Sequence, residues 1–270
     1  MRCGTRRSPP PVCGADVVAG AAFFDLDRTL LRRSSALALA GSFRDRGLIS
    51  RWQLARAALW QLLFVLRGAS HEAVRRGAED GLIVLRGSTP EELRSLVVDA
   101  LEPVLRPLVY AEPLQLVEQH KQRGEPVYIV SATLQEIVQA IADDLGFDGA
   151  LGTVCEVRDG VYTGRALRAL HAANKAAGVR ELAEAEGFDL AECTAYSDSH
   201  TDLPFLEAVG HPVVVNPDGE LRRIAGDRGW PVLEFSARAY PYARRRVPPA
   251  VLLLPLAVGV VLGAMRRRGR

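Results

Sequence analysis

The chain has 270 residues, of which 48% are hydrophobic, and a formal net charge of +2. This length suits one large globular domain or a domain with an insertion, and the small net charge gives no support for a nucleic-acid partner. The four cysteines, Cys3, Cys13, Cys155 and Cys193, form no CxxC pair. This spacing argues against a zinc site and a disulfide framework, and it predicts reduced thiols in an intracellular protein.

The N-terminal residues 1–18 contain the arginines Arg6 and Arg7 and a Pro9–Pro11 run, but no apolar stretch like that of a secretory signal. We expect a disordered lead that precedes the first structured element.

Short apolar runs, rich in β-branched or aromatic residues, predict buried parallel strands. They cover 17–27, 126–133, 193–199 and 212–218. Amphipathic helical patterns cover 111–123, 134–145, 174–186 and 201–208. This alternation predicts an α/β fold with a doubly wound parallel sheet, covered by helices on both faces.

Residues 34–106 interrupt the alternation with helical patterns alone. The expected helices cover 35–46, 50–67, 71–85 and 90–105, the last starting after Thr89 at Pro90. We interpret this region as a helical insertion, able to cover the strand ends as a lid. Its most apolar stretch, 54–66, is expected to be a core helix, with a membrane-facing patch as the alternative. A second insertion, 153–165, contains Asp159-Gly160 and is expected to form a hairpin.

Residues 247–265 carry no charge over 19 positions and have arginines on both sides. A helix of that length spans roughly 28 Å, close to the thickness of a hydrocarbon core. The segment predicts an apolar C-terminal helix that anchors the chain in a membrane, with the catalytic part on the cytoplasmic side. A buried or interfacial apolar tail of a cytoplasmic protein is the alternative.

Asp25 and Asp27 lie at the end of the first predicted strand, in the sequence FFDLDRTLL. Two carboxylates this close repel each other unless something compensates their charge. A hard cation such as Mg²⁺ prefers oxygen ligands of this kind, so the pair is a candidate metal and catalytic site. The alternative is an ordinary surface turn with Asp-x-Asp spacing.

Other polar side chains occur where later strands end or helices begin. Ser131 and Thr133 in YIVSAT can bind a phosphate oxygen, or can cap the next helix. Lys175, one of two lysines in the chain, can balance the charge of a phosphate, or can lie on the surface. Asp198 and Asp202 in YSDSHTDLP can complete a Mg²⁺ shell, or can cap a helix.

The order of these motifs, D-x-D-x-T, a strand-end Ser, a Lys and S-D-x-x-x-D, resembles the haloacid dehalogenase superfamily, subfamily IB, over roughly residues 19–235. The helical insertion is similar to the cap of phosphoserine-phosphatase-like members. The resemblance implies a catalytic core made of 19–33 and 107–238 and a cap made of 34–106. It also implies a Mg²⁺-dependent phosphomonoester hydrolase that works through an aspartyl-phosphate.

The same resemblance implies a role for each motif residue. Asp25 would be the nucleophile and Asp27 the general acid/base, and both would bind Mg²⁺ together with Asp198, Asp27 through its backbone carbonyl. Lys175 would balance charge on Asp25 and the phosphate. The remaining expected members are Ser131, Thr133 and Arg28 for substrate, with Asp202 and Thr29 in support.

The chain differs from the phosphoserine phosphatase pattern at two positions, and both differences affect the expected substrate. Phosphoserine phosphatases of this family have Ser after the second motif aspartate and Glu nine residues after the nucleophile, where this chain has Arg28 and Ser34. Ser34 cannot supply the carboxylate that would hold a substrate ammonium group. We therefore expect a small-molecule or lipid-linked phosphate, with phosphoserine as a second candidate. Arg28 favours an acidic or multiply phosphorylated substrate, or it points into solvent. The motifs are also compatible with a phosphotransferase, and the fold with a non-enzymatic membrane-tethered module.

Overall fold

The computed structural model describes residues 20–47, 82 and 85–240. The predicted lead 1–18, the predicted helix 50–67, most of the predicted helix 71–85 and the apolar segment 247–265 lie outside these residues. Among the residues that are described, no helix is both long enough and apolar enough to traverse a bilayer.

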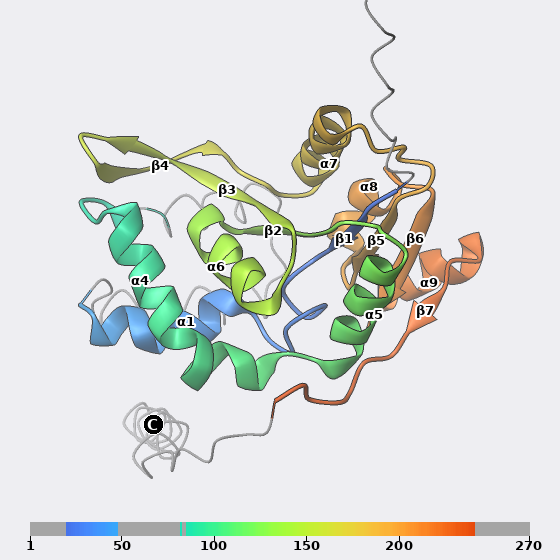
Figure 1. Cartoon of the computed structure of the whole chain (residues 1–270), viewed down its shortest axis with the longest axis horizontal. Coiled ribbons are helices and arrows are strands. Elements are labelled where there is room, and N and C mark those ends of the chain that lie inside the picture. Colours follow the sequence, from blue (N-terminus) through green and yellow to red (C-terminus); the bar gives the residue numbers. More distant parts are fainter. Residues whose placement is uncertain (1–19, 48–81, 83–84, 241–270) are drawn as a thin grey trace, which may run out of the picture. The chain divides into compact units, whose positions relative to one another are not determined.

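The described residues form a seven-stranded sheet with the short strand β1 (Ala22–Phe24) at its centre (Figure 1). The strand order is β4-β3-β2-β1-β5-β6-β7, and all neighbours pair in parallel except β3 and β4. The other strands are β2 (Val127–Leu134), β3 (Gly149–Arg158), β4 (Val161–Arg168), β5 (Thr194–Ser197), β6 (His211–Val215) and β7 (Val232–Leu233). The predicted α/β fold with a mostly parallel sheet is confirmed.

Helices cover both faces of the sheet, because successive residues of a buried strand point to opposite sides. Phe23 packs in the cluster that contains apolar residues of α7, α8 and α9, whereas Phe24 packs in the cluster that contains those of α5 and α6. The bounds of these helices are Ala111–Gln122 for α5, Gln135–Leu145 for α6, Ala173–Glu186 for α7, Leu203–Leu206 for α8 and Gly219–Arg228 for α9. The sheet is therefore doubly wound, as predicted.

Two helices of the 34–106 region are described, α1 (Ser35–Asp45) and α4 (Pro90–Ala100). Thr89 caps α4 as predicted, since its side chain accepts a hydrogen bond from the Glu92 backbone and the Glu92 side chain accepts one from the Thr89 backbone. The predicted helix 90–105 is α-helical as far as Ala100. Its last turn is a π-helical segment, Leu101–Leu105, followed by a 3₁₀ turn, Arg106–Leu108. Pro103 lies in this segment and has no N–H for a regular helical bond.

The predicted hairpin is present, and its turn residues Asp159 and Gly160 have φ values of 52° and 81°. Left-handed conformations at both positions are typical of a two-residue hairpin turn. The hairpin is longer than the predicted 153–165, since β3 begins at Gly149 and β4 ends at Arg168. Its first strand, β3, also pairs with β2 in the main sheet. It is thus an extension of the sheet's edge as well as an insertion between core elements.

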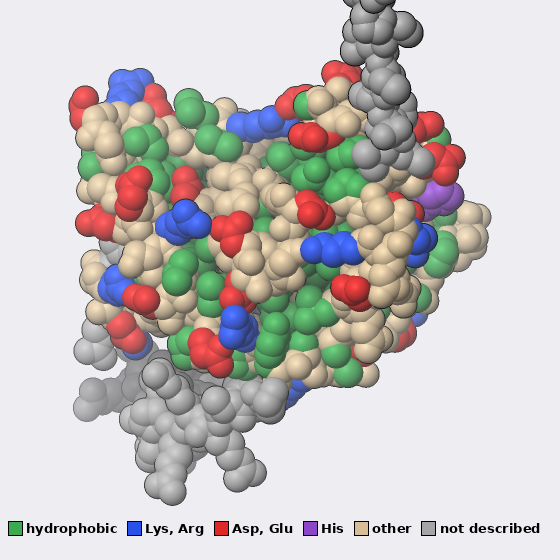
Figure 2. All heavy atoms as spheres, in the orientation of Figure 1, with side chains coloured by type: hydrophobic (Ala, Val, Ile, Leu, Met, Phe, Trp, Pro, Cys, Tyr) green, Lys and Arg blue, Asp and Glu red, His purple; other side chains and the backbone are tan. Residues whose placement is uncertain are grey.

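Acidic and basic side chains are interspersed over the described surface visible in Figure 2, as the formal net charge of +2 leads one to expect. On this face we see no field of a single sign among the described residues.

Candidate active site

The C-terminal ends of β1, β2 and β5 meet at one edge of the sheet and surround a pocket of about 140 Å³. Ligands of doubly wound sheets bind at this edge. The predicted residues that line the pocket are Asp25, Asp27, Arg28, Ser131, Lys175, Asp198 and Asp202. Two predicted members, Thr29 and Thr133, are not among its lining residues.

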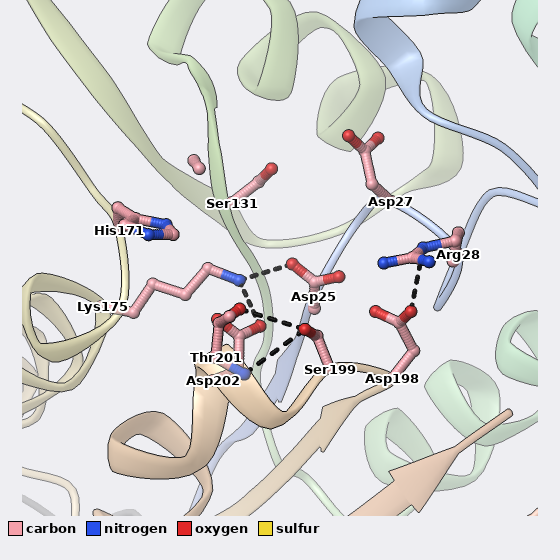
Figure 3. A pocket seen from close by; sticks show the side chains of 11 residues that line it. Asp25, Asp27, Arg28, Ser131, His171, Lys175, Asp198, Ser199, Thr201 and Asp202 are labelled. Atoms are coloured by element: carbon pink, nitrogen blue, oxygen red, sulfur yellow. Dashed lines mark hydrogen bonds and ion pairs between the residues drawn. The ribbon is translucent and has the colours of Figure 1, made fainter. Parts of the chain in front are cut away.

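Lys175 joins two carboxylates at the base of the pocket (Figure 3). Its Nζ donates to Asp25 Oδ1 at 2.5 Å and to Asp202 Oδ2 at 2.6 Å, and Ser197 Oγ donates to the same Asp202 oxygen at 2.8 Å. All of these side chains are buried. Burial alone would lower the pKa of Lys175, but the two carboxylates raise it above its ordinary value. The amine therefore stays charged between the two aspartates.

Burial also dominates the protonation of Asp25. It raises the pKa of this carboxyl to about 8, against the opposing charge of Lys175, and the nearby Asp202 and Asp198 raise it further. The site thus holds more negative charge than its own cations neutralise. One more positive charge close to Asp25 would favour its ionised form.

Asp198 lies just after β5 and forms an ion pair with Arg28, whose Nε is 3.0 Å from Asp198 Oδ2. The Asp198 side chain is 5% exposed, whereas that of Arg28 is 63% exposed. Burial raises the pKa of Asp198 to about 6, although Arg28 acts in the opposite direction.

Asp27 is held away from the Lys175–Asp25 pair by the start of α1. Its Oδ1 accepts a hydrogen bond from the Ser35 backbone N–H at 2.7 Å, and in Figure 3 its carboxylate points away from Asp25. Ser35 is the first residue of α1, so its N–H is one of the free donors at a helix N-terminus, where negative charge is stabilised. The Ser35 hydroxyl in turn lies 3.1 Å from Thr133 Oγ1.

The predicted hydroxyl residues therefore differ in their surroundings. Ser131 is buried, lines the pocket, and accepts a hydrogen bond from the Thr133 backbone at 3.1 Å, which leaves its own O–H available as a donor. Thr133 contacts the Ser35 hydroxyl instead of the pocket. Thr29 is fully buried, and its Oγ1 has no hydrogen-bond partner within the described part of the chain.

Sequence reasoning missed four polar residues of this site. Ser199 and Thr201 line the pocket and contact each other at 3.0 Å between their hydroxyls; they lie between two predicted residues, which is a signal that could have found them. His171 also lines the pocket, from an exposed position four residues before Lys175. In the sequence, Ser35 is typical of the start of a helix, and no motif indicates its contact with Asp27.

The donor set of the pocket fits Mg²⁺. Among the described residues, no cluster of three or more Asp, Glu, His or Cys side chains is arranged to hold a metal ion. Asp25 and Asp198 are nevertheless two buried carboxylates with raised pKa values, and Asp27 lines the same pocket. Mg²⁺ binds proteins through one or two carboxylates and keeps several waters, so a site of this composition suits it.

Comparison with known proteins gives concordant results. The family model of haloacid dehalogenase-like hydrolases matches residues 22–207. A probable phosphatase of Mycobacterium tuberculosis is 42% identical over 275 residues, which cover 97% of this chain and 95% of that protein. A phosphoserine phosphatase of the same organism is 36% identical over 269 residues, which cover 99% of this chain and 85% of that protein.

The fold also has solved counterparts. The crystal structure of a protein of unknown function from Bordetella pertussis superposes with a TM-score of 0.71 at 30% identity, covering 80% of this chain and 98% of that one.

Proposed function

The chain belongs to the haloacid dehalogenase-like hydrolase family, and we propose that this phosphatase hydrolyses phosphomonoesters through an aspartyl-phosphate formed on Asp25. The observation that carries the proposal is the buried Asp25 carboxylate, held by Lys175 at the base of a pocket at the strand ends. Family membership, which the order of the motifs predicted, is confirmed. The roles of individual residues are our inference from their positions.

In the first step, a carboxylate oxygen of Asp25 attacks phosphorus while the bond between phosphorus and the ester oxygen breaks. Asp27 protonates the departing oxygen, which leaves as an alcohol. In the second step, Asp27 takes a proton from water, and the water oxygen attacks phosphorus. The bond to Asp25 then breaks, so inorganic phosphate leaves and the free carboxylate returns.

Other pocket residues stabilise the negative charge that develops on the phosphoryl oxygens. Lys175 is a fixed positive charge beside Asp25, and the Ser131 hydroxyl is a donor at the same edge. Asp25, Asp198 and the Asp27 carbonyl would hold Mg²⁺, which supplies charge neutralisation for the nucleophile and the phosphate. Asp202 keeps Lys175 in place through its 2.6 Å contact.

We propose that the substrate is a small or lipid-linked phosphate. Phosphoserine is the second candidate, favoured by the relative that bears this name. Against phosphoserine, the position expected to bind its ammonium group holds Ser34, the N-cap residue of α1. A phosphotransferase would use the same Asp25 intermediate with another acceptor, and product analysis with candidate alcohols would reveal it.

Hydrolysis of p-nitrophenyl phosphate with and without Mg²⁺ tests the function. We expect Mg²⁺-dependent turnover by the wild type, trapping by beryllium fluoride, and no turnover by Asp25→Asn, which keeps the size of the side chain. Retained phosphatase activity in a folded Asp25→Asn variant would refute the assignment of the nucleophile. A panel of phosphorylated metabolites and lysophospholipids would then identify the substrate.

We also propose that residues 34–106 act as a cap over this site and that residues 247–265 anchor the chain in a membrane. Carbonate extraction of membranes tests the anchor. Release of the full-length protein into the soluble fraction would contradict it.

A further inference from the structure

Arg28 has an unusual backbone conformation at the mouth of the pocket. Its φ is 66°, in the left-handed region that residues other than glycine seldom adopt. Backbone strain of this kind persists only where the surroundings impose it, and it is frequent at functional sites. Arg28 follows the motif residue Asp27 in the sequence, and in Figure 3 its side chain extends towards Asp198.

The guanidinium of Arg28 contacts a carboxylate that a metal ion would also need. Its Nε is 3.0 Å from Asp198 Oδ2, and its side chain is 63% exposed. Arg28 is the exposed member of this pair, so solvent screens its guanidinium, and its long side chain loses freedom in the contact. The carboxylate itself is buried, so its ionised form needs a positive partner close by. A divalent cation and Arg28 are therefore competing partners for Asp198.

The pocket also limits where the rest of a substrate can lie. Its volume of about 140 Å³ is well below the roughly 300–1,000 Å³ of pockets that enclose a whole small molecule. It therefore suits a phosphate group, with the remainder of the substrate at the mouth. Of the two basic Lys and Arg side chains that line it, Lys175 is buried between Asp25 and Asp202, whereas Arg28 is exposed at the mouth.

We propose that Arg28 determines specificity: it neutralises Asp198 in the free enzyme, and a divalent cation displaces it so that it binds a second anionic group of the substrate. That group is a carboxylate or a second phosphate, attached to the same molecule as the phosphate that is cleaved. A guanidinium presents paired donors that match the two oxygens of either anion. This inference rests on the proposed function, because that proposal makes Asp198 a metal ligand.

The competition is tested by titrating the purified, metal-free protein with Mg²⁺ in a calorimeter. We expect Arg28→Gln to bind Mg²⁺ about two- to fivefold more tightly than the wild type, the range expected when the competing cation is a solvent-exposed guanidinium. Arg94→Gln is the matched control, because it removes another exposed Arg–Asp pair, that with Asp143. It should leave the Mg²⁺ affinity unchanged. Equal or weaker Mg²⁺ binding by Arg28→Gln would overturn the proposed competition.

Specificity is tested with matched substrates. Glycerol 3-phosphate and 3-phosphoglycerate differ by one carboxylate, and propanediol monophosphate and bisphosphate differ by one phosphate, so the two pairs separate the two kinds of anion. We expect the wild type to prefer the more anionic member of at least one pair by about tenfold in kcat/KM, mainly through KM. Arg28→Gln should lose that preference, and Arg28→Lys should keep part of it.

The outcomes separate this inference from the proposed function. Hydrolysis of these substrates with no preference in the wild type, or with a preference that Arg28→Gln retains, would overturn the role of Arg28 in specificity while the phosphatase assignment stands. Absence of hydrolysis of all four substrates and of p-nitrophenyl phosphate would contradict the proposed function. In that case, the Mg²⁺ titration alone decides whether Arg28 competes for Asp198.

Discussion

Replacing Lys175 by methionine should destabilise the fold strongly, because this lysine is the shared partner of two buried carboxylates. The exposed fractions of the three side chains are 4% for Lys175, 8% for Asp25 and 6% for Asp202. Methionine fills a similar volume but leaves Asp25 and Asp202 buried without a cation, so that each must stay charged without a partner or take up a proton. Breaking a buried ion pair by removing one partner costs about 3–5 kcal/mol.

The measurement is urea unfolding and thermal melting with EDTA present, so that no metal ion replaces the lost charge. At about 2–4 °C per kcal/mol for a chain of this size, we expect a melting temperature lower by roughly 6–20 °C. The other lysine of the chain provides the control. Lys121 lies in the last turn of α5 and donates to the Gly146 carbonyl at the surface, so Lys121→Met should change stability by less than about 1 kcal/mol.

A double variant separates charge from packing. Asp202→Asn removes one of the two stranded carboxylates, so Lys175→Met combined with Asp202→Asn should be more stable than Lys175→Met alone. If Lys175→Met unfolds within about 1 kcal/mol of the wild type, or if the double variant recovers nothing, the buried ion triad does not stabilise the fold through its charges.

Three further predictions concern other parts of the fold. Ala172→Gly should raise the melting temperature, because Ala172 has φ 48° and ψ −117°, a conformation that is strained by about 1–3 kcal/mol in a residue with a Cβ atom. An unchanged or lower melting temperature would contradict this strain. If Thr133 positions Asp27 through Ser35, Thr133→Val should lower kcat a few-fold at constant KM. Thr133→Ser keeps the hydroxyl and is the control, and a rise in KM for Thr133→Val would instead indicate direct contact with substrate. Finally, burial lowers the pKa of His120 below its usual 6.5. The contribution of His120 to the free energy of unfolding is therefore fully present above pH 6.5, and it is lost as the pH falls towards the pKa of His120 in the folded protein. Between pH 7.5 and pH 5.5, the free energy of unfolding in urea should therefore fall less for His120→Gln than for the wild type.

The sheet and the pocket could be predicted because their signals are local. An apolar run followed by an aspartate, as at Asp25 and Asp198, indicates both a buried strand and a functional group at its end. The parallel topology then brings these strand ends together. The turn at Asp159-Gly160 follows from two residues alone, and it is present.

The features that could not be predicted depend on contacts distant in sequence. Whether the Thr133 side chain contacts the pocket or Ser35 depends on where α1 begins relative to β2, and no sequence periodicity indicates this. The strained φ of Ala172 and of Arg28 likewise has no sequence signature, since both residues ordinarily adopt negative φ. The sequence does not indicate β3 as a core strand, because Gly149 and Gly152 weaken its apolar pattern.

The surplus of carboxylates in the pocket has a consequence for the order in which ligands bind. Asp25, Asp27, Asp198 and Asp202 line one small volume and are opposed there by the basic side chains of Lys175 and Arg28. A phosphate dianion alone therefore meets repulsion, while a divalent cation alone must displace a guanidinium. Each ligand removes the obstacle to the other, and linkage requires the two affinities to rise by the same factor. We expect the cation and the phosphate ester to bind as a cooperative pair, so that cellular phosphates do not occupy the pocket when the divalent cation is scarce.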